Sequence, residues 1–285
     1  MKPTEKRRGT MASTIKCLSV LELLAREPFE FGLFEISASL DAPKTSTHRL
    51  VATLMEAGFV EQDGDSRRYR LTGKALWVGT GFLRHSRVYR ASFPVMQDLA
   101  GKTEGMVHLG LWDNDAVLYL HTVGHPSSLY LFANTGERRA VHATALGKVM
   151  LAYRSPEDLE RIFSKEVERY TDKTITSLDA MRRELETIRD QGYALDDEEG
   201  VRGLRCLAAA IRDHKGQVVA AISMSAPTSV LAEDNRPHYA SLVQEAAIRA
   251  SVHAGYRPLT TNVSSLLTRP YEAGETSRRK SASPS

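Results

Sequence analysis

The residues from Lys44 to Arg49 carry side chains that could bind nucleic acid. The run reads Lys-Thr-Ser-Thr-His-Arg, and no acidic residue occurs between Lys44 and Ala52. Short hydroxyl groups and an imidazole at the start of a helix can hydrogen bond to base edges in a major groove, whereas long cations reach phosphates. Arg67 and Arg68, which follow later in the chain, are further candidates for phosphate contacts. The residues expected to contact DNA are Lys44, Thr45, Ser46, Thr47, His48, Arg49, Arg67 and Arg68.

The flanking pattern predicts the two helices of a helix-turn-helix, which would position these side chains. Apolar residues recur three and four positions apart over residues 33–40, and a short break follows. Pro43 suits the first position of a second helix, where its missing N–H is no loss. The apolar stripe of that second helix is expected on Leu50, Leu54 and Ala57. A short turn between two such helices makes a helix-turn-helix.

A β-hairpin, or wing, is predicted directly after the second helix, over residues 59–71. Apolar residues there flank a polar Asp-Gly-Asp turn. Arg67 and Arg68 are expected at the tip of the wing, in contact with phosphate. A helix over residues 13–25 would complete the module. The alternative, a helical hairpin with a solvated polar face, does not explain the lack of acidic residues after Lys44.

Length, composition and charge narrow the class of protein. The 285 residues suggest two domains, and no apolar run reaches the roughly 18 residues that a membrane span needs. No signal peptide is visible at the start. Cys17 and Cys206 lie far apart without metal-ligand spacing, which fits a reduced, cytoplasmic protein. Residues 1–90 carry 15 Lys and Arg against 10 Asp and Glu, whereas the remainder carries 23 against 25. The excess of cations therefore lies with the predicted helix-turn-helix.

Five segments are expected along the chain. They are a disordered arm over 1–12, a winged helix-turn-helix DNA-binding domain over 13–72, a linker helix over 73–88, a second domain over 89–256 and a disordered tail over 257–285. Leu76, Trp77 and Phe82 give the linker helix more apolar surface than a lone helix needs. This surface predicts contact with a second copy of the chain, as expected for readers of two half-sites. Packing on the chain's own domains is the alternative.

The second domain is predicted to be α+β, because its helices are set around alternating strands. Helices are expected over 92–100, 142–153, 177–191 and 235–254, and another is expected to open at Ser155-Pro156. Strands are expected over 106–112, 116–123, 128–132, 204–211 and 217–225.

Three motifs resemble the IclR-type transcriptional regulators, and the resemblance covers about residues 13–256. Residues 43–50 resemble the opening of the family's recognition helix, a feature common among winged helices. Residues 141–152 (Val-His-Ala-Thr-Ala-Leu-Gly-Lys-Val-Met-Leu-Ala) resemble a more specific signature. A third signature is matched by residues 192–199 (Gly-Tyr-Ala-Leu-Asp-Asp-Glu-Glu) and 203–209 (Gly-Leu-Arg-Cys-Leu-Ala-Ala). The resemblance implies a winged helix-turn-helix, a linker helix and a C-terminal, GAF-like α/β effector-binding domain.

The resemblance further implies dimers, often paired into tetramers, that bind palindromic operators in double-stranded DNA. It also implies effectors that are small carboxylates. Backbone N–H groups before Gly147 would hold the effector's carboxylate, since a helix start offers such donors. Ser223 and Ser225 alternate on a strand and therefore share a face. Ala210 replaces a proline that is usual in the family. The implied effector residues are Ala145, Leu146, Asp196, Leu204, Cys206, Ser223 and Ser225.

The expected function is a DNA-binding transcriptional regulator, expected to act as a repressor, without enzyme activity, cofactor or metal. One alternative is a Cys-dependent hydrolase fused to a winged helix, with Cys206 as nucleophile and His142 and Asp196 as partners. Cys206 lies in an apolar strand, which favours an inert thiol. Metal sensing is disfavoured because the nine histidines lack ligand spacing. A purely oligomerising second domain would not need Asp196 and the two serines to converge.

Overall fold

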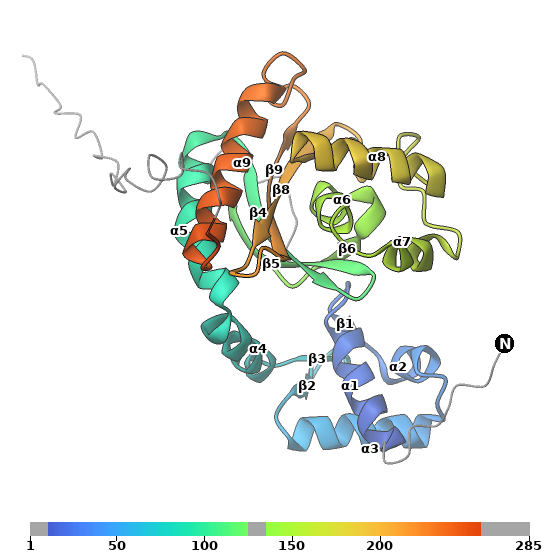
Figure 1. Ribbon diagram of the computed structural model, residues 1–285. Coiled ribbons are helices and arrows are strands. Elements are labelled where there is room, and N and C mark those ends of the chain that lie inside the picture. The colour runs from blue at the N-terminus through green and yellow to red at the C-terminus, as the bar shows by residue number, and fades with distance from the viewer. Residues whose placement is uncertain (1–10, 125–134, 258–285) are drawn as a thin grey trace, which may run out of the picture. The chain divides into compact units, whose positions relative to one another are not determined.

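The computed structural model describes residues 11–124 and 135–257 (Figure 1). The chain divides into two compact units, the first ending at His85 and the second beginning at Ser86. The strand expected over 128–132 and the two expected disordered ends lie mostly or wholly outside the described residues.

Three helices form the body of the first unit. They are α1 (Ala12–Leu24), α2 (Leu33–Ser39) and α3 (Lys44–Glu56), with Pro43 as the N-cap of α3 rather than its first residue. The helices and the wing share one small core, which contains Val20, Leu24, Ile36, Val51, Leu54, Val60 and Tyr69. The predicted helix-turn-helix is therefore present.

The wing is a three-stranded antiparallel sheet rather than the simple hairpin that was predicted. Strands β2 (Val60–Gln62) and β3 (Tyr69–Leu71) form the hairpin, and β1 (Glu30–Phe31) pairs with the other side of β3. The register places Phe31 opposite Tyr69. Strand β1 has only two residues, too short for alternation of apolar and polar side chains to reveal it.

The apolar stripe of α3 differs from the expected one. Thr47, Val51 and Leu54 are buried, whereas Leu50 is half-buried and Ala57 is exposed. These three buried positions are four and three residues apart and therefore share one face of the helix. Thr47 fits this face because its hydroxyl donates a hydrogen bond to the carbonyl of Pro43, 3.2 Å away, which satisfies the polar group within the helix.

Two helices follow the wing. Helix α4 (Gly73–His85) ends three residues before the expected limit of the linker helix, and α5 (Arg87–Lys102) begins earlier than the expected helix over 92–100. Ser86 separates them, since its hydroxyl accepts a hydrogen bond from the N–H of Tyr89 and so caps α5. No residue of α4 is buried.

The second unit is built on one six-stranded sheet in the order β6-β5-β4-β9-β8-β7, with every neighbouring pair antiparallel. The strands are β4 (Met106–Asp113), β5 (Ala116–Gly124), β6 (Arg138–Ala140), β7 (Ala194–Asp197), β8 (Leu204–Arg212) and β9 (Val218–Pro227). The two edge strands, β6 and β7, were not predicted. Both are short, with three and four residues.

Helices cover both faces of this sheet (Figure 1). Helix α5 and α9 (Arg236–His253) lie on one face, and α6 (Ala145–Leu151), α7 (Pro156–Phe163) and α8 (Leu178–Gln191) lie on the other. Cap residues explain several of these limits. The hydroxyls of Ser155 and Ser177 accept N–H groups at the starts of α7 and α8, and Gly192 ends α8 in a left-handed conformation. The predicted α+β class is confirmed.

The helix expected over 142–153 is broken at its start. A 3₁₀ turn occupies Val141–Ala143, Thr144 is extended, and α6 begins at Ala145. A Cβ at Gly147 would lie 2.2 Å from the carbonyl oxygen of Val141. The turn and α6 can therefore pack this closely only because residue 147 is glycine.

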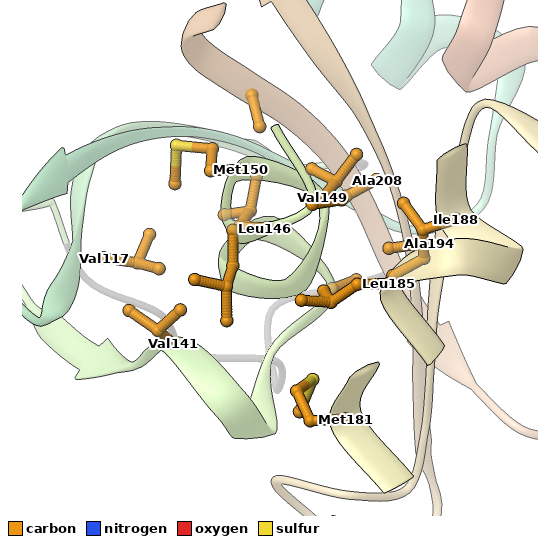
Figure 2. Close-up of a cluster of buried hydrophobic side chains, with 14 of the residues drawn as sticks. Val117, Val141, Leu146, Val149, Met150, Met181, Leu185, Ile188, Ala194 and Ala208 are labelled. Atoms are coloured by element: carbon orange, nitrogen blue, oxygen red, sulfur yellow. The ribbon is translucent and has the colours of Figure 1, made fainter. Parts of the chain in front are cut away.

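Helix α6 forms the centre of the core of the second unit, as Figure 2 shows. Its apolar side chains lie between Val117 of β5 and two residues of α8, Leu185 and Ile188. Ala194 of β7 and Ala208 of β8 belong to the same core and lie beside Ile188, and their small size lets helix and sheet approach closely. The core therefore fixes the start of α6 over the sheet.

Candidate functional site

The predicted recognition surface is the exposed face of α3. Lys44, Thr45, Ser46, His48 and Arg49 are all exposed, and the first turn of the helix contains no acidic residue. The ammonium of Lys44 lies 5.0 Å from the centre of the Phe34 ring, a cation–π contact. The surface thus presents hydroxyl, imidazole and cationic groups together.

Thr47 does not belong to this surface. It is fully buried, and its hydroxyl is bonded to Pro43 as described above. The prediction that Thr47 faces DNA is therefore wrong, because the buried face of α3 passes through this position.

Arg68 is held within the fold rather than extended at the tip of the wing. Its Nη2 donates hydrogen bonds to Oε2 of Glu35, 2.8 Å away, and to the carbonyl of Glu30, 3.1 Å away. The same Glu35 oxygen accepts the backbone N–H of Gly32, and this bond together with Arg68 lowers the pKa of Glu35. This ion pair joins the wing to α2, and the phosphate contact of Arg68 remains a prediction.

Arg67 is an exposed cation of the wing. Its side chain makes no ion pair within the described part of the chain, whereas the neighbouring Arg70 is paired with Glu61 at 2.7 Å. The backbone of Arg67 is left-handed, with φ of 58°, and its carbonyl accepts a hydrogen bond from the side chain of Gln62. This turn directs one arginine to solvent and leaves the next for the ion pair with Glu35.

A cavity of about 340 Å³ opens in the second unit, a size suited to a small molecule. The lining comes from all six strands of the sheet, from the turn that leads into α6 and from the loop between β7 and β8. It consists of His108, Tyr119, Arg139, Ala143, Thr144, Asp196, Gly200, Val201, Arg202, Gly203, Leu204, Cys206 and Ser225. Strand pairing explains part of this convergence, since Asp196 lies opposite Cys206 and Cys206 lies opposite Ser225.

Four of the seven predicted effector residues line this cavity, namely Asp196, Leu204, Cys206 and Ser225. Ser223 lies two residues before Ser225 on β9, opposite Ala208 of β8; it is buried and is not part of the described lining. Ala145 and Leu146 are also buried and are not among the lining residues, which include Ala143 and Thr144 instead. Leu146 packs instead in the core of the unit (Figure 2).

Asp196 supplies a buried carboxyl group to the cavity wall. Its Oδ1 accepts hydrogen bonds from the backbone N–H groups of Glu199, at 2.7 Å, and Gly200, at 3.4 Å. Burial raises the pKa of Asp196 to about 6, although the charge of Lys148 opposes this shift. Gly200 is required here, since a Cβ would lie 2.9 Å from the carbonyl of Ala143. At neutral pH, Asp196 is therefore mainly an ionised hydrogen-bond acceptor.

A buried ion cluster lies directly behind Asp196. Lys148 of α6 is 1% exposed, and its ammonium donates to Glu184, Glu199 and the carbonyl of Leu195. Burial raises the pKa of Glu199 to about 7, against the opposing charge of Lys148. Oε2 of Glu199 has no hydrogen-bond partner within the described residues. One ammonium thus holds carboxyl groups from both α8 and the β7–β8 loop.

The residues of the hydrolase alternative do not form a nucleophilic site. The hydroxyl of Ser225 donates to the sulfur of Cys206, and burial raises the pKa of this thiol. His142 instead bonds to the carbonyl of Glu168, 2.8 Å away, and stacks on Tyr170. Asp196 lies beside Cys206, but its charge adds to burial in raising the pKa of the thiol, so the thiolate that a nucleophile needs is disfavoured.

Residues 11–124 and 135–257 contain no group of three or more His, Cys, Asp or Glu side chains arranged to hold a metal ion. Over the same residues, no helix is long and apolar enough to cross a membrane.

Sequence reasoning missed several residues of the cavity. His108 and Tyr119 lie on strands whose alternation predicted burial but not a role. Arg139 belongs to a strand too short to be predicted, and Thr144 lies in the specific signature as the N-cap of α6. Arg139 stands two residues before the signature that begins at residue 141. This position could have indicated a role in the cavity, because the chain there must approach the start of α6.

Comparisons with known proteins agree with this two-part architecture. The family model described as the IclR helix-turn-helix domain matches residues 13–64, and that described as the bacterial transcriptional regulator IclR C-terminal matches residues 80–252. The HTH-type transcriptional regulator KdgR of Escherichia coli (strain K12) is 33% identical over 253 residues, which cover 88% of this chain and 96% of that protein. The transcriptional repressor IclR of the same organism is 30% identical over 251 residues, which cover 87% and 91% of the two chains.

A solved structure extends the likeness to three dimensions. An IclR homologue from Microbacterium hydrocarbonoxydans, crystallised in complex with 4-hydroxybenzoate, matches with a TM-score of 0.74 and 25% identity over 85% of this chain and 99% of that chain. The relatives named above are regulators, which gives the hydrolase alternative no support. The resemblance stated from three motifs is thereby confirmed: this chain belongs to the IclR family of helix-turn-helix, DNA-binding transcriptional regulators.

Proposed function

We propose that this regulator is a repressor, acting on DNA in the cytoplasm, whose operator affinity is set by a small organic acid bound in the second unit. The observation that carries the proposal is the cavity in which Asp196, Cys206 and Ser225 meet. A relative of the same fold was crystallised with 4-hydroxybenzoate, which supports an acid as ligand. Another relative bears the name of a repressor, which supports the direction of control.

Operator contacts would come from the exposed face of α3 and from Arg67. Lys44, Thr45, Ser46, His48 and Arg49 would lie in the major groove and on its phosphates. Palindromic operators need two copies of this surface, so we infer a homodimer, which could pair further into a tetramer. The exposed apolar side chains of α4 support such a contact, since Leu76 and Trp77 are 71% and 69% exposed.

The effector would bind mainly through the polar side chains of the cavity. Asp196, Cys206 and Ser225 offer a carboxylate, a thiol and a hydroxyl on adjacent strands, and Leu204 offers apolar contact. The amides of Ala145 and Leu146, and the hydroxyl of Ser223, remain proposed contacts that would require a ligand to reach behind the described lining. The cavity size favours a compact acid.

Control would operate by a shift between two populations of the dimer. Effector binding would favour one relative placement of the paired winged helices, and a given half-site spacing matches only one placement. A coupling free energy of about 1–3 kcal/mol would change operator affinity roughly 5- to 150-fold.

The proposal can be tested by titrating the full chain onto DNA from upstream of its own gene, with and without small carboxylates that include 4-hydroxybenzoate. We expect Arg49→Ala to abolish operator binding and to retain any acid-induced rise in melting temperature. Ser225→Ala should do the opposite. Arg182→Ala, an exposed arginine on α8, is the matched control and should change neither.

Two results would refute the proposal. The first is failure of the wild-type chain to bind its upstream DNA at low salt. The second is binding that no small carboxylate alters. A further check is the salt response, because release of counterions by several cations predicts a steep fall in affinity with salt concentration.

A further inference from the structure

One segment between α7 and α8 contacts two separate walls of the cavity. It comprises residues 168–174, which form neither helix nor strand, and we call it the bracing segment. The first wall is the loop over residues 198–203, between β7 and β8, and the second is the turn over residues 141–144 that leads into α6. Residues of both walls belong to the cavity lining described above, whereas none of the bracing segment does. The segment can therefore influence a ligand only through the walls that it contacts.

Two buried hydroxyl groups of the bracing segment hold the backbone of the first wall. Thr171 and Thr174 are 6% and 4% exposed. Oγ1 of Thr171 donates to the carbonyl of Glu198, 2.8 Å away, and Oγ1 of Thr174 donates to the carbonyl of Glu199, 2.7 Å away. The Thr174 hydroxyl also accepts the N–H groups of Tyr170, at 3.1 Å, and Thr171, at 2.8 Å. Its proton and both lone pairs are thus in use, so one hydroxyl fixes the bracing segment and the wall together.

The same stretch of the first wall is bonded to Asp196 on its other side. The N–H of Glu199 donates to Oδ1 of Asp196 at 2.7 Å, while its carbonyl accepts the hydroxyl of Thr174. Only Glu199 therefore separates Thr174 from a side chain that lines the cavity. The backbone of Glu198 is left-handed, with φ of 65°, a conformation that a residue with a side chain keeps only where its surroundings hold it. The threonine hydroxyls supply part of that support.

His142 links the bracing segment to the second wall. The residue is 4% exposed, and its Nε2 donates to the carbonyl of Glu168, 2.8 Å away. Its ring stacks on that of Tyr170, with centres 6.0 Å apart. Burial lowers the pKa of His142, so the ring is neutral at pH 7 and makes this contact as an ordinary N–H donor. Ala143 and Thr144, the next two residues, line the cavity.

Ion pairs between the bracing segment and the first wall are less important than the hydroxyl groups. Asp172 pairs with Arg202 at 3.1 Å, but the two side chains are 74% and 75% exposed. Lys173, which pairs with Glu198 at 2.7 Å, is 43% exposed. Exposed pairs contribute little because water screens them, whereas a buried carbonyl that loses its donor is unfavourable.

We propose that Thr171, Thr174 and His142 are positioning residues of the cavity, which hold its two walls in place through a segment outside the lining. A site whose walls are already ordered loses less conformational entropy when a ligand binds. In giving the walls a part in ligand binding, the inference rests on the proposed function. The order of the walls can nevertheless be measured on the full chain without ligand or DNA.

The first test is hydrogen exchange, followed by mass spectrometry of peptides from the full chain. Thr174→Val keeps the shape of the side chain but removes its hydroxyl, so residues 198–203 should exchange about 10-fold faster or more. Over the same exchange times, β4 and β9 at the centre of the sheet should remain protected. Thr174→Ser retains the hydroxyl and should restore slow exchange. Thr187→Val is the matched control, because the hydroxyl of Thr187 bonds to Arg183 within α8, and it should leave the exchange of the wall unchanged.

The second test uses the two cysteines as reporters. Cys206 lines the cavity and Cys17 lies in the first unit, so alkylation by iodoacetamide can be followed at each of them by peptide mass spectrometry. Thr174→Val should raise the rate at Cys206 about 10-fold or more, because a displaced wall exposes the thiol, and should leave the rate at Cys17 unchanged. His142→Phe keeps a ring beside Tyr170 but loses the bond to Glu168, and it should act in the same way through the second wall.

Several results would overturn the inference. They are wild-type rates at both the first wall and Cys206 in Thr174→Val and at Cys206 in His142→Phe, an equal increase in the Thr187→Val control, or failure of Thr174→Ser to restore slow exchange. Loss of protection in β4 and β9 together with the wall would also overturn it, because the hydroxyl would then support the fold of the whole unit and not the cavity walls. Failure of the wild-type chain to bind its upstream DNA would instead overturn the proposed function, and would leave these measurements unaffected.

Discussion

Replacement of Lys148 by methionine should strongly destabilise the second unit. Lys148 is fully buried and bonded to Glu184 and Glu199, and the Glu199 side chain is itself 6% exposed. Removing the ammonium would leave a carboxylate buried without its counter-charge, which costs about 3–5 kcal/mol. For a unit of this size, each kcal/mol lowers the melting temperature by roughly 2–4 °C, so we expect a loss of roughly 6–20 °C at pH 8.

The loss should shrink in acid, which distinguishes it from a packing defect. The pKa of Glu199 is already raised to about 7, and without Lys148 its carboxyl would be protonated more readily still. A protonated carboxyl is less costly to bury, so Lys148→Met should be less damaging at pH 5.5 than at pH 8. The double substitution Lys148→Met with Glu199→Gln should recover part of the stability at pH 8.

The assay is urea unfolding followed by circular dichroism at the two pH values. Lys173→Met is the control, because Lys173 also pairs with two acids but is 43% exposed, and exposed pairs contribute no more than about 1 kcal/mol. The reasoning would be refuted if Lys148→Met and Lys173→Met were equally stable at pH 8, or if the loss did not depend on pH.

Three further predictions concern stability and DNA binding. In the wild-type chain, the folded protein binds a proton at Glu199 more tightly than the unfolded chain does, because the pKa of Glu199 is raised to about 7. The free energy of unfolding should therefore fall as pH rises from about 4.5 to about 7. Glu199→Gln should reduce this dependence on pH, as measured by unfolding curves. Gly147→Ala should lower the free energy of unfolding by about 1–3 kcal/mol or more in the same assay, because the added Cβ would overlap the turn before α6. Gly101→Ala is the control: its added Cβ would meet nothing within 4 Å, so the substitution should be neutral or slightly stabilising. Arg67→Ala should weaken DNA binding and reduce the slope of log affinity against log salt by about 1 without changing stability. Arg68→Ala should lower the melting temperature slightly and leave that slope unchanged. Equal salt slopes and equal melting temperatures for the two variants would contradict the division of roles in the wing.

Much of the fold could be predicted because its signals are local. Helical spacing and cap residues such as Ser155, Ser177 and Gly192 mark element limits within a few positions. The two edge strands and β1 were missed because two to four residues are too few to show a period. Their strand character comes from pairing with distant partners.

The sites could be predicted in part, for a related reason. Asp196, Cys206 and Ser225 were identified together, and strand register brings them together. The ion pair of Arg68 was not predicted, because its partner Glu35 is far away in sequence. Thr47 was misassigned because a threonine that bonds to its own helix can be buried like an apolar residue.

The Arg68–Glu35 pair has a consequence for the thermodynamics of operator recognition. The carboxylate of Glu35 accepts hydrogen bonds from both the N–H of Gly32 and the side chain of Arg68. It therefore links the hairpin to the start of α2 in the absence of DNA. A hairpin that is already rigid loses little conformational entropy when it binds DNA, so it can contribute to affinity with few direct contacts. Removing this ion pair should therefore weaken binding to operator DNA through a larger loss of conformational entropy, even though no residue that contacts the duplex has changed.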